Sequence, residues 1–125
     1  MARVLLIDDS ADFREAMTLG LLSAGHVVSI ADDGERGLTL QAEFMAEVVV
    51  TDIFMPNKDG IETIQEFKAQ YPAVRIIAVS AGGRGEKSSY LSVARTAGAD
   101  AILPKPFRIQ ELLDAIEKVQ LAGIE

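Results

Sequence analysis

The chain has 125 residues, of which 49% are hydrophobic and 25% charged, and its formal net charge is −7 with no cysteine. This composition indicates one globular domain, and the acidic balance argues against nonspecific binding to nucleic acid, which rewards Lys and Arg. Disulfides and cysteine-ligated metal sites are excluded, and because the sequence has neither the ~20 apolar residues of a membrane span nor a secretory segment of about 7–15, we expect a cytoplasmic protein.

Short apolar runs alternate along the chain with longer amphipathic segments. The runs predict strands at residues 3–8, 26–32, 47–52, 74–80 and 100–104. Most of these runs are continuous rather than alternating, which is typical of parallel strands covered on both faces.

The amphipathic segments predict helices. Ser10 can cap the first helix, and Gly25 marks its end. The others are predicted at 34–44, 60–70, 87–96 and from 109 to about 119. Strict alternation of strand and helix favours an α/β domain with a parallel sheet and right-handed crossovers.

Polar and charged residues stand at the carboxyl ends of four predicted strands. They are Asp8 and Asp9 after the first, Asp52 at the third, Ser80 at the fourth and Lys105 after the fifth. Ligands of open α/β sheets bind at these ends, where the strand order reverses. In the strand order 2-1-3-4-5, the three carboxylates would share one crevice.

Three carboxylates in one crevice repel one another, so a purely structural role would make the folded state costly. Two of them ~5 Å apart repel by about 3 kcal/mol at an effective dielectric constant of ~20, whereas a whole domain is stable by only ~5–15 kcal/mol. A divalent cation would remove this cost, and hard oxygen ligands with room for water and phosphate suit Mg²⁺. An aspartate beside Mg²⁺ can attack a phosphoryl group and form an acyl phosphate.

Two further residues suit the same chemistry. Ser80 can donate a hydrogen bond to a phosphoryl oxygen, and Lys105 can neutralise its charge. Pro104 and Pro106 stiffen the loop that aims Lys105, and the Lys105–Pro106 bond is a candidate for the cis form.

These motifs in this order resemble the receiver domain of two-component response regulators. The shared features are DD after the first strand, D followed by MPxxDG at the third, S or T at the fourth and KP after the fifth. The resemblance covers the whole chain and implies a flavodoxin-like, doubly wound, five-stranded parallel sheet of order 2-1-3-4-5 with five helices. It implies a single receiver domain over residues 1–125 without an effector domain, and Met1 and the tail LAGIE favour a complete small protein.

The resemblance also implies roles for the site residues. Asp52 would be the phosphoacceptor, and Mg²⁺ would be bound by Asp9, Asp52 and the backbone carbonyl of Phe54, with Asp8 acting through water. Ser80 would be the switch hydroxyl, and Lys105 would contact the phosphate. The implied partners are a sensor histidine kinase or histidine phosphotransfer protein, and a downstream protein target on the face of the fourth helix, fifth strand and fifth helix.

Other functions remain as alternatives. The domain would be a phosphoacceptor rather than an enzyme, but it could instead be a phosphorelay intermediate that passes the group to a histidine phosphotransfer protein. A phosphohydrolase with an aspartyl nucleophile is disfavoured, because Phe54 stands where such an enzyme usually has its second acid. A flavin or nucleotide binder is disfavoured by the acidic loop DDSAD, which repels phosphate in the absence of a metal, and because no Gly-rich loop follows the first strand.

Three positions depart from the family pattern or vary within it. Ile102 stands where the family often has an aromatic switch residue, so we expect switching to use the loop after the fourth strand and the fourth helix in another way. Phe54 and Gly82 stand two residues after Asp52 and Ser80, at positions that influence access of the hydrolytic water. We hypothesise that Phe54 hinders this water and lengthens the lifetime of the phosphoryl group.

Overall fold

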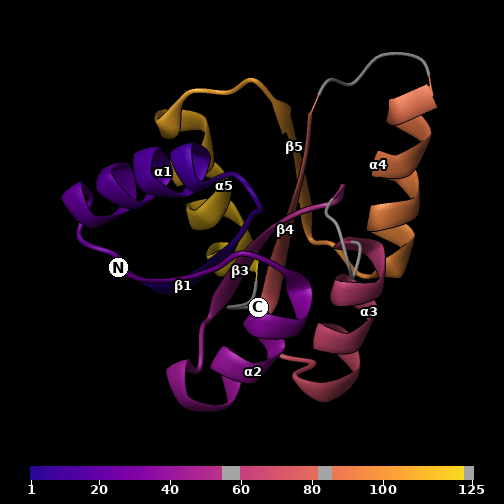
Figure 1. Ribbon diagram of the computed structural model, residues 1–125, viewed down its shortest axis with the longest axis horizontal. Helices are drawn as coiled ribbons and strands as arrows, with labels where there is room; N and C mark the ends of the chain where they lie inside the picture. Colours follow the sequence, from indigo (N-terminus) through magenta and orange to yellow (C-terminus); the bar gives the residue numbers. More distant parts are fainter. Residues whose placement is uncertain (55–59, 82–85, 123–125) are drawn as a thin grey trace.

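The computed structural model describes residues 1–54, 60–81 and 86–122, with the backbone alone at residues 81 and 86–91. In these ranges, strands and helices alternate (Figure 1). The strands are β1 (Arg3–Ile7), β2 (Val27–Ala31), β3 (Val48–Asp52), β4 (Arg75–Ala81) and β5 (Ala101–Lys105). The helices are α1 (Ala11–Ser23), α2 (Gly34–Phe44), α3 (Gly60–Gln70), α4 (Glu86–Ala97) and α5 (Ile109–Ala122). Within the described ranges, no helix is both long and apolar enough to span a membrane.

The strands form one parallel sheet in the order β2-β1-β3-β4-β5, which is the predicted order. The predicted strands and helices are all present, and most of their ends differ by a single residue. For example, β4 continues to Ala81 and β5 to Lys105, one residue beyond the predicted ends of each. The prediction of a flavodoxin-like, doubly wound sheet with five helices is therefore confirmed.

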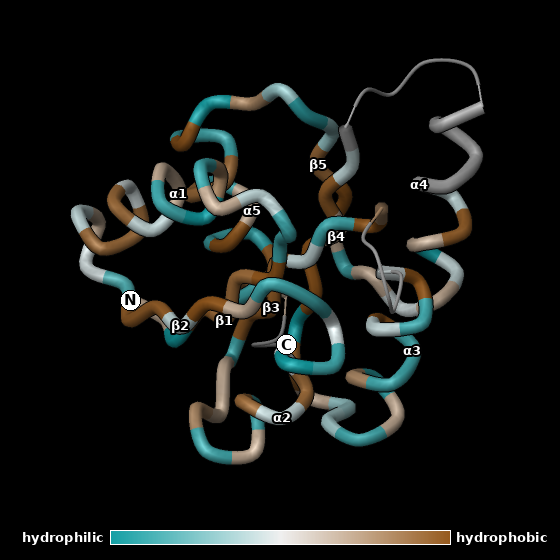
Figure 2. The backbone as a smooth tube through the Cα atoms, in the orientation of Figure 1, coloured by the Kyte–Doolittle hydropathy of each residue, from teal (hydrophilic) through white to brown (hydrophobic). Residues whose placement is uncertain are grey.

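Two apolar cores cover the two faces of the sheet. On β1, Leu5 and Ile7 point into a core that includes residues of α2, α3 and α4, while Val4 and Leu6 point into a core with α1 and α5. Figure 1 shows the same division of the helices, and Figure 2 shows apolar residues along the strands between them. Burial on both faces explains why the strands read as continuous apolar runs.

Short-range contacts hold the ends of β3 and α1 at the carboxyl edge of the sheet. The Ser10 hydroxyl accepts a hydrogen bond from the backbone N–H of Phe13 at 3.2 Å, as expected for an N-terminal cap. The start of α3 lies against the end of β3, where a Cβ on Gly60 would stand 2.1 Å from the carbonyl oxygen of Asp52. Only glycine permits this approach, which leaves the Asp52 backbone packed against α3.

Candidate functional site

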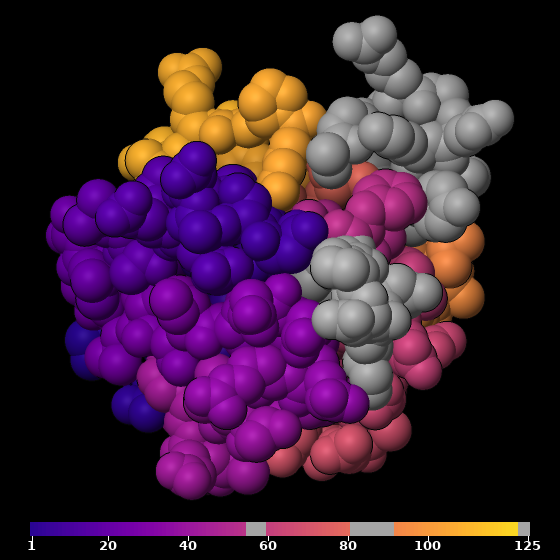
Figure 3. Space-filling view, viewed as in Figure 1, coloured from indigo at the N-terminus to yellow at the C-terminus, as the bar shows by residue number. Residues whose placement is uncertain are grey.

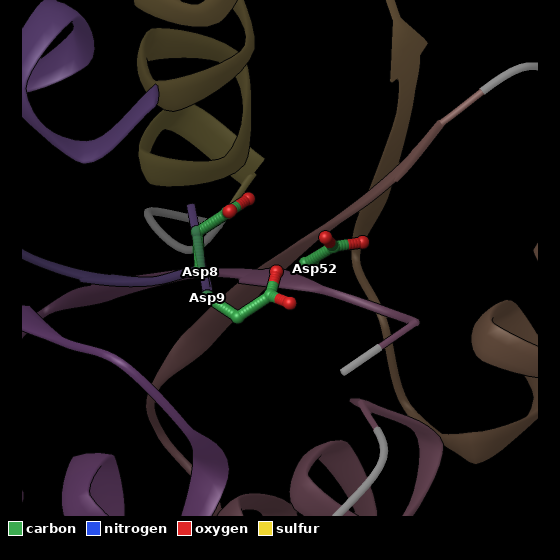
Figure 4. Close-up of side chains that lie close together, drawn as sticks. All are labelled: Asp8, Asp9 and Asp52. Atoms are coloured by element: carbon green, nitrogen blue, oxygen red, sulfur yellow. The ribbon is translucent and has the colours of Figure 1, made fainter. Parts of the chain in front are cut away.

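Three aspartates meet at the carboxyl edge of the sheet. Asp8 and Asp9 follow β1, and Asp52 ends the neighbouring strand β3 (Figure 4). One carboxylate oxygen from each lies within 4.8 Å of the others. Asp8 and Asp52 are buried, with 1% and 5% of their surfaces exposed, whereas Asp9 is exposed. Two of the three carboxylates are therefore buried, and the third is accessible to solvent.

Lys105 brings the fifth strand into this cluster. Its Nζ lies 2.9 Å from an Asp8 carboxylate oxygen and 3.6 Å from an Asp52 oxygen. The residue ends β5 between two prolines, and the Lys105–Pro106 peptide bond is cis. On the surface, the segment around residue 105 adjoins the N-terminal part of the chain (Figure 3). One ammonium thus faces two of the three carboxylates, and the cluster keeps a net negative charge.

Asp8 is fixed by donors from two directions. One of its carboxylate oxygens accepts from the backbone N–H of Ser10 at 2.9 Å, and the other accepts from Lys105. Its backbone carbonyl accepts from the Arg14 guanidinium at 2.6 Å. The Asp8 carboxylate is therefore held in place by one backbone N–H and one ammonium.

Asp52 is held in an environment that disfavours its charge. Burial raises the pKa of its carboxyl group above the ordinary value of 3.8, and the neighbouring Asp8 and Asp9 add to this effect. Lys105 and a hydrogen bond from the backbone N–H of Phe54, at 3.2 Å, act in the opposite direction. The net rise in pKa means that a further cation near Asp52 would be favoured.

Ser80 contributes a buried hydroxyl at the carboxyl end of β4, next to the end of β3. It lies on β4 opposite Pro104, one position beyond Val79, which pairs with Asp52. The residue is fully buried, and its Oγ makes no hydrogen bond with any described residue. A buried hydroxyl without a partner is unfavourable, so a ligand oxygen at this position would satisfy it.

The remaining predicted positions fall into two groups. Phe54 follows the end of β3 with 38% of its surface exposed, and Ile102 is half-buried on β5, paired with Ala78. Gly82 and most of the MPNKDG turn, residues 55–59, lie outside the described residues.

Sequence reasoning missed two residues of the site. Phe13 lies under Lys105, whose Nζ is 4.0 Å from the centre of the phenyl ring, and Arg14 supports the carbonyl of Asp8. Phe13 lies in the first turn of α1, far from Lys105 in the sequence. Its contact with Lys105 joins opposite ends of the chain, so no local pattern predicts it.

The donor set fits a small, hard divalent cation. The carboxylates of Asp8, Asp9 and Asp52 offer oxygen atoms that could hold a cation, that of Asp9 is exposed to solvent, and among the described residues the cluster carries more negative than positive charge. Few protein oxygens, with room for water, are typical of Mg²⁺ rather than of Ca²⁺, which takes six to eight ligands.

The family model for the response regulator receiver domain matches residues 4–117 of the chain. A response regulator MprA of Mycolicibacterium vanbaalenii is 34% identical over 111 residues, which cover 89% of this chain and 47% of the relative. The probable C4-dicarboxylate response regulator DctR of Bacillus subtilis is 34% identical over 118 residues, which cover 93% of this chain and 51% of that protein. The chain therefore spans about half the length of these curated relatives.

Solved structures show the same fold. The chemotaxis protein CheY4 of Vibrio cholerae matches with a TM-score of 0.85 and 28% identity, over 95% of this chain and 98% of that one. A CheY-like receiver domain protein of Methanospirillum hungatei matches with a TM-score of 0.89 and 25% identity, over 98% and 96% of the two chains. NtrX of Brucella abortus gives a TM-score of 0.90 at 25% identity, but only 27% of its chain is covered.

Proposed function

Because the chain belongs to the response regulator receiver domain family, we propose that residues 1–125 act as one receiver domain that accepts a phosphoryl group on Asp52. The donor is a phosphohistidine on a sensor histidine kinase or histidine phosphotransfer protein. We propose that this transfer takes place in the cytoplasm and that the domain acts as a signalling switch rather than as an enzyme with its own substrate.

One observation carries this proposal: among the described residues, the cluster of Asp8, Asp9 and Asp52 has one ammonium beside it, that of Lys105. Such a cluster is costly for folding, because burial first, and then the neighbouring Asp8 and Asp9, raise the pKa of Asp52. Phosphoryl transfer uses both features, since it needs a carboxylate nucleophile and positive charge around the transferring group. The hydroxyl of Ser80, which has no hydrogen-bond partner among the described residues, supports the same proposal because it offers a donor for a phosphoryl oxygen.

In the proposed reaction, a carboxylate oxygen of Asp52 forms a bond to phosphorus while the bond from phosphorus to the imidazole nitrogen of the donor breaks. The electron pair of that bond stays on the nitrogen, and the product is an aspartyl phosphate. Lys105 neutralises charge on the group in transfer, and the hydroxyl of Ser80 donates a hydrogen bond to one of the phosphoryl oxygens. The short reach of Lys105 to both Asp8 and Asp52 supports this role.

We propose that Asp9, Asp52 and the backbone carbonyl of Phe54 bind Mg²⁺, with Asp8 acting through water. The ion, when bound, would supply positive charge that stabilises the transferring phosphoryl group. The exposed carboxylate of Asp9 and the contacts of the Asp8 carboxylate with Ser10 and Lys105 support this division of roles.

The output is proposed to pass through the face of α4, β5 and α5, to which a downstream protein binds. Phosphorylation would shift the population of conformations of this face. Ile102, on β5, replaces the aromatic residue that often moves in such switches, so the shift must use other side chains of the face.

Intact mass measurement tests the proposed function. The protein is incubated with acetyl phosphate and Mg²⁺, and the Asp52→Asn variant is treated in parallel. We expect one added phosphoryl group on the wild type and none on the variant. Equal modification of both proteins, or of neither, would count against Asp52 as the acceptor.

A further prediction concerns the lifetime of the phosphorylated state. Phe54 stands two residues after the acceptor, its backbone N–H donates to an Asp52 carboxylate oxygen, and 38% of its surface is exposed. We expect this side chain to hinder the water that hydrolyses the aspartyl phosphate. In Phe54→Asn, an amide that can bind and orient this water should raise the dephosphorylation rate by about tenfold. The rate is measured by intact mass after the donor is removed.

Val93→Asn is the matched control for this measurement, because Val93 is an exposed apolar residue on α4 outside the acidic cluster. It should keep the dephosphorylation rate of the wild type. An unchanged rate in Phe54→Asn would show that Phe54 does not limit access of the water.

A further inference from the structure

The ammonium group of Lys105 rests on an aromatic ring. Its Nζ lies 4.0 Å from the centre of the Phe13 ring, well within the distance at which a cation is attracted to a ring face. The side chain of Lys105 is only 20% exposed, so solvent weakens this attraction less than at an open surface. The contact therefore bears directly on where the ammonium lies.

Phe13 is itself fixed from two sides. It belongs to the first turn of α1, where its backbone N–H donates to the Ser10 cap. Its ring also packs against that of Phe107, with 5.8 Å between the ring centres and an angle of 86° between their planes. This edge-to-face geometry is a favourable one for two aromatic rings. The ring face that Lys105 meets is thus held by the helix start and by the loop after β5.

These contacts connect Lys105 and Asp8 by a second route, through Ser10 and Phe13. An Asp8 oxygen accepts from the N–H of Ser10, and the Ser10 hydroxyl accepts from the N–H of Phe13. The Phe13 ring supports Lys105, which returns to Asp8 through its ammonium. The position of the ammonium is therefore coupled to the cap of α1 as well as to the carboxylates.

We propose that Phe13 is a positioning residue for Lys105, which holds the ammonium between Asp8 and Asp52 where the transferring phosphoryl group arrives. This inference rests on the proposed function. Lysine has a long flexible stem, so without the ring its ammonium would sample many other positions. A ring face attracts the cation without offering an oxygen acceptor, so the N–H donors remain available to carboxylate and phosphoryl oxygens.

The test compares Phe13→Leu and Phe13→Tyr with the wild type. Leucine keeps the site apolar but removes the ring face, whereas tyrosine keeps the ring. We expect the rate of phosphorylation by acetyl phosphate with Mg²⁺ to fall by about fivefold in Phe13→Leu and to stay within about twofold of the wild type in Phe13→Tyr.

A spectroscopic signal separates positioning from general packing. In protein with ¹³C-labelled lysine, the CεH₂ protons of Lys105, identified by their disappearance in Lys105→Met, should be shifted upfield by the ring. This shift should be lost in Phe13→Leu and kept in Phe13→Tyr. It is measured without phosphodonor, so it is independent of phosphorylation. If the leucine variant fails to fold, Phe13→Met takes its place.

Phe44→Leu is the matched control. The Arg3 guanidinium lies over the Phe44 ring, 4.4 Å from its centre, at the amino end of β1 and away from the acidic cluster. It should leave the phosphorylation rate unchanged. A wild-type rate in Phe13→Leu, or a Lys105 signal without an upfield shift in the wild type, would overturn the inference. A wild type that takes up no phosphoryl group would instead contradict the proposed function, while the Lys105 signal would still report on the position of the ammonium.

Discussion

Without Mg²⁺, the Asp52→Asn variant is expected to unfold at a higher temperature than the wild type. The substitution removes one buried carboxylate from a cluster of three, and its amide oxygen can still accept from the N–H of Phe54. One bare pair of carboxylates ~5 Å apart costs about 3 kcal/mol, and Lys105 offsets part of this. We therefore expect a gain of roughly 1–2 kcal/mol, or roughly 3–10 °C in Tm.

The pH dependence of this difference follows from the pKa of Asp52, which the fold raises above 3.8. The folded protein thus binds the Asp52 proton more tightly than the unfolded chain does. The stability of the wild type without metal should therefore fall as the pH rises from 3.8 through the raised pKa. The variant lacks this loss, so the Tm difference should widen over this window and become constant above it.

Thermal unfolding in a chelator, across this pH range, measures the effect. Glu117→Gln is the control, since it removes one negative charge from an exposed position on α5. Added Mg²⁺ should raise the Tm of the wild type more than that of Asp52→Asn. A variant that is no more stable than the wild type in chelator would contradict the argument from charge repulsion.

Lys105→Met is expected to slow phosphoryl transfer strongly. The ammonium lies 2.9 Å from Asp8 and 3.6 Å from Asp52, and methionine keeps much of the side-chain length without the charge. Loss of one preorganised donor that stabilises a transition state typically costs about 10²–10³ in rate. We expect a loss of this size in the rate of phosphorylation by acetyl phosphate with Mg²⁺, followed by intact mass.

Lys118→Met is the matched control, because Lys118 is exposed on α5. It should phosphorylate at the wild-type rate. If Lys105→Met did so as well, the ammonium would have no part in the transfer, and its contacts with Asp8 and Asp52 would serve folding alone.

The fold could be predicted from the sequence because buried strands and helices leave recognisable patterns of apolar residues along the chain. The run of valines in β3 is buried on both faces, as a central parallel strand requires, and Ser10 caps α1 as predicted. Gly25 and Gly98, at φ +93° and +130°, follow the ends of two helices in backbone conformations that favour glycine. These signals act over a few residues, so they can be read locally.

The cluster could also be predicted, but not its supporting contacts. Once the strand order is known, Asp8, Asp9, Asp52 and Lys105 must meet at one edge, since parallel strands end together there. The placement of Phe13 under Lys105 depends instead on how α1 and the loop after β5 pack together. Spacing along the chain carries no information about that packing.

The central claim is that Asp52 carries the phosphoryl group, and chemical mapping tests it most directly. Borohydride reduces an aspartyl phosphate to homoserine, which marks the acceptor permanently. Trypsin then separates the candidates, because the peptide 37–58 contains Asp52 as its sole aspartate, while Asp8 and Asp9 lie in the peptide 4–14. We predict homoserine at position 52 after treatment with acetyl phosphate and Mg²⁺. Homoserine at position 8 or 9, or at no position, would contradict the account.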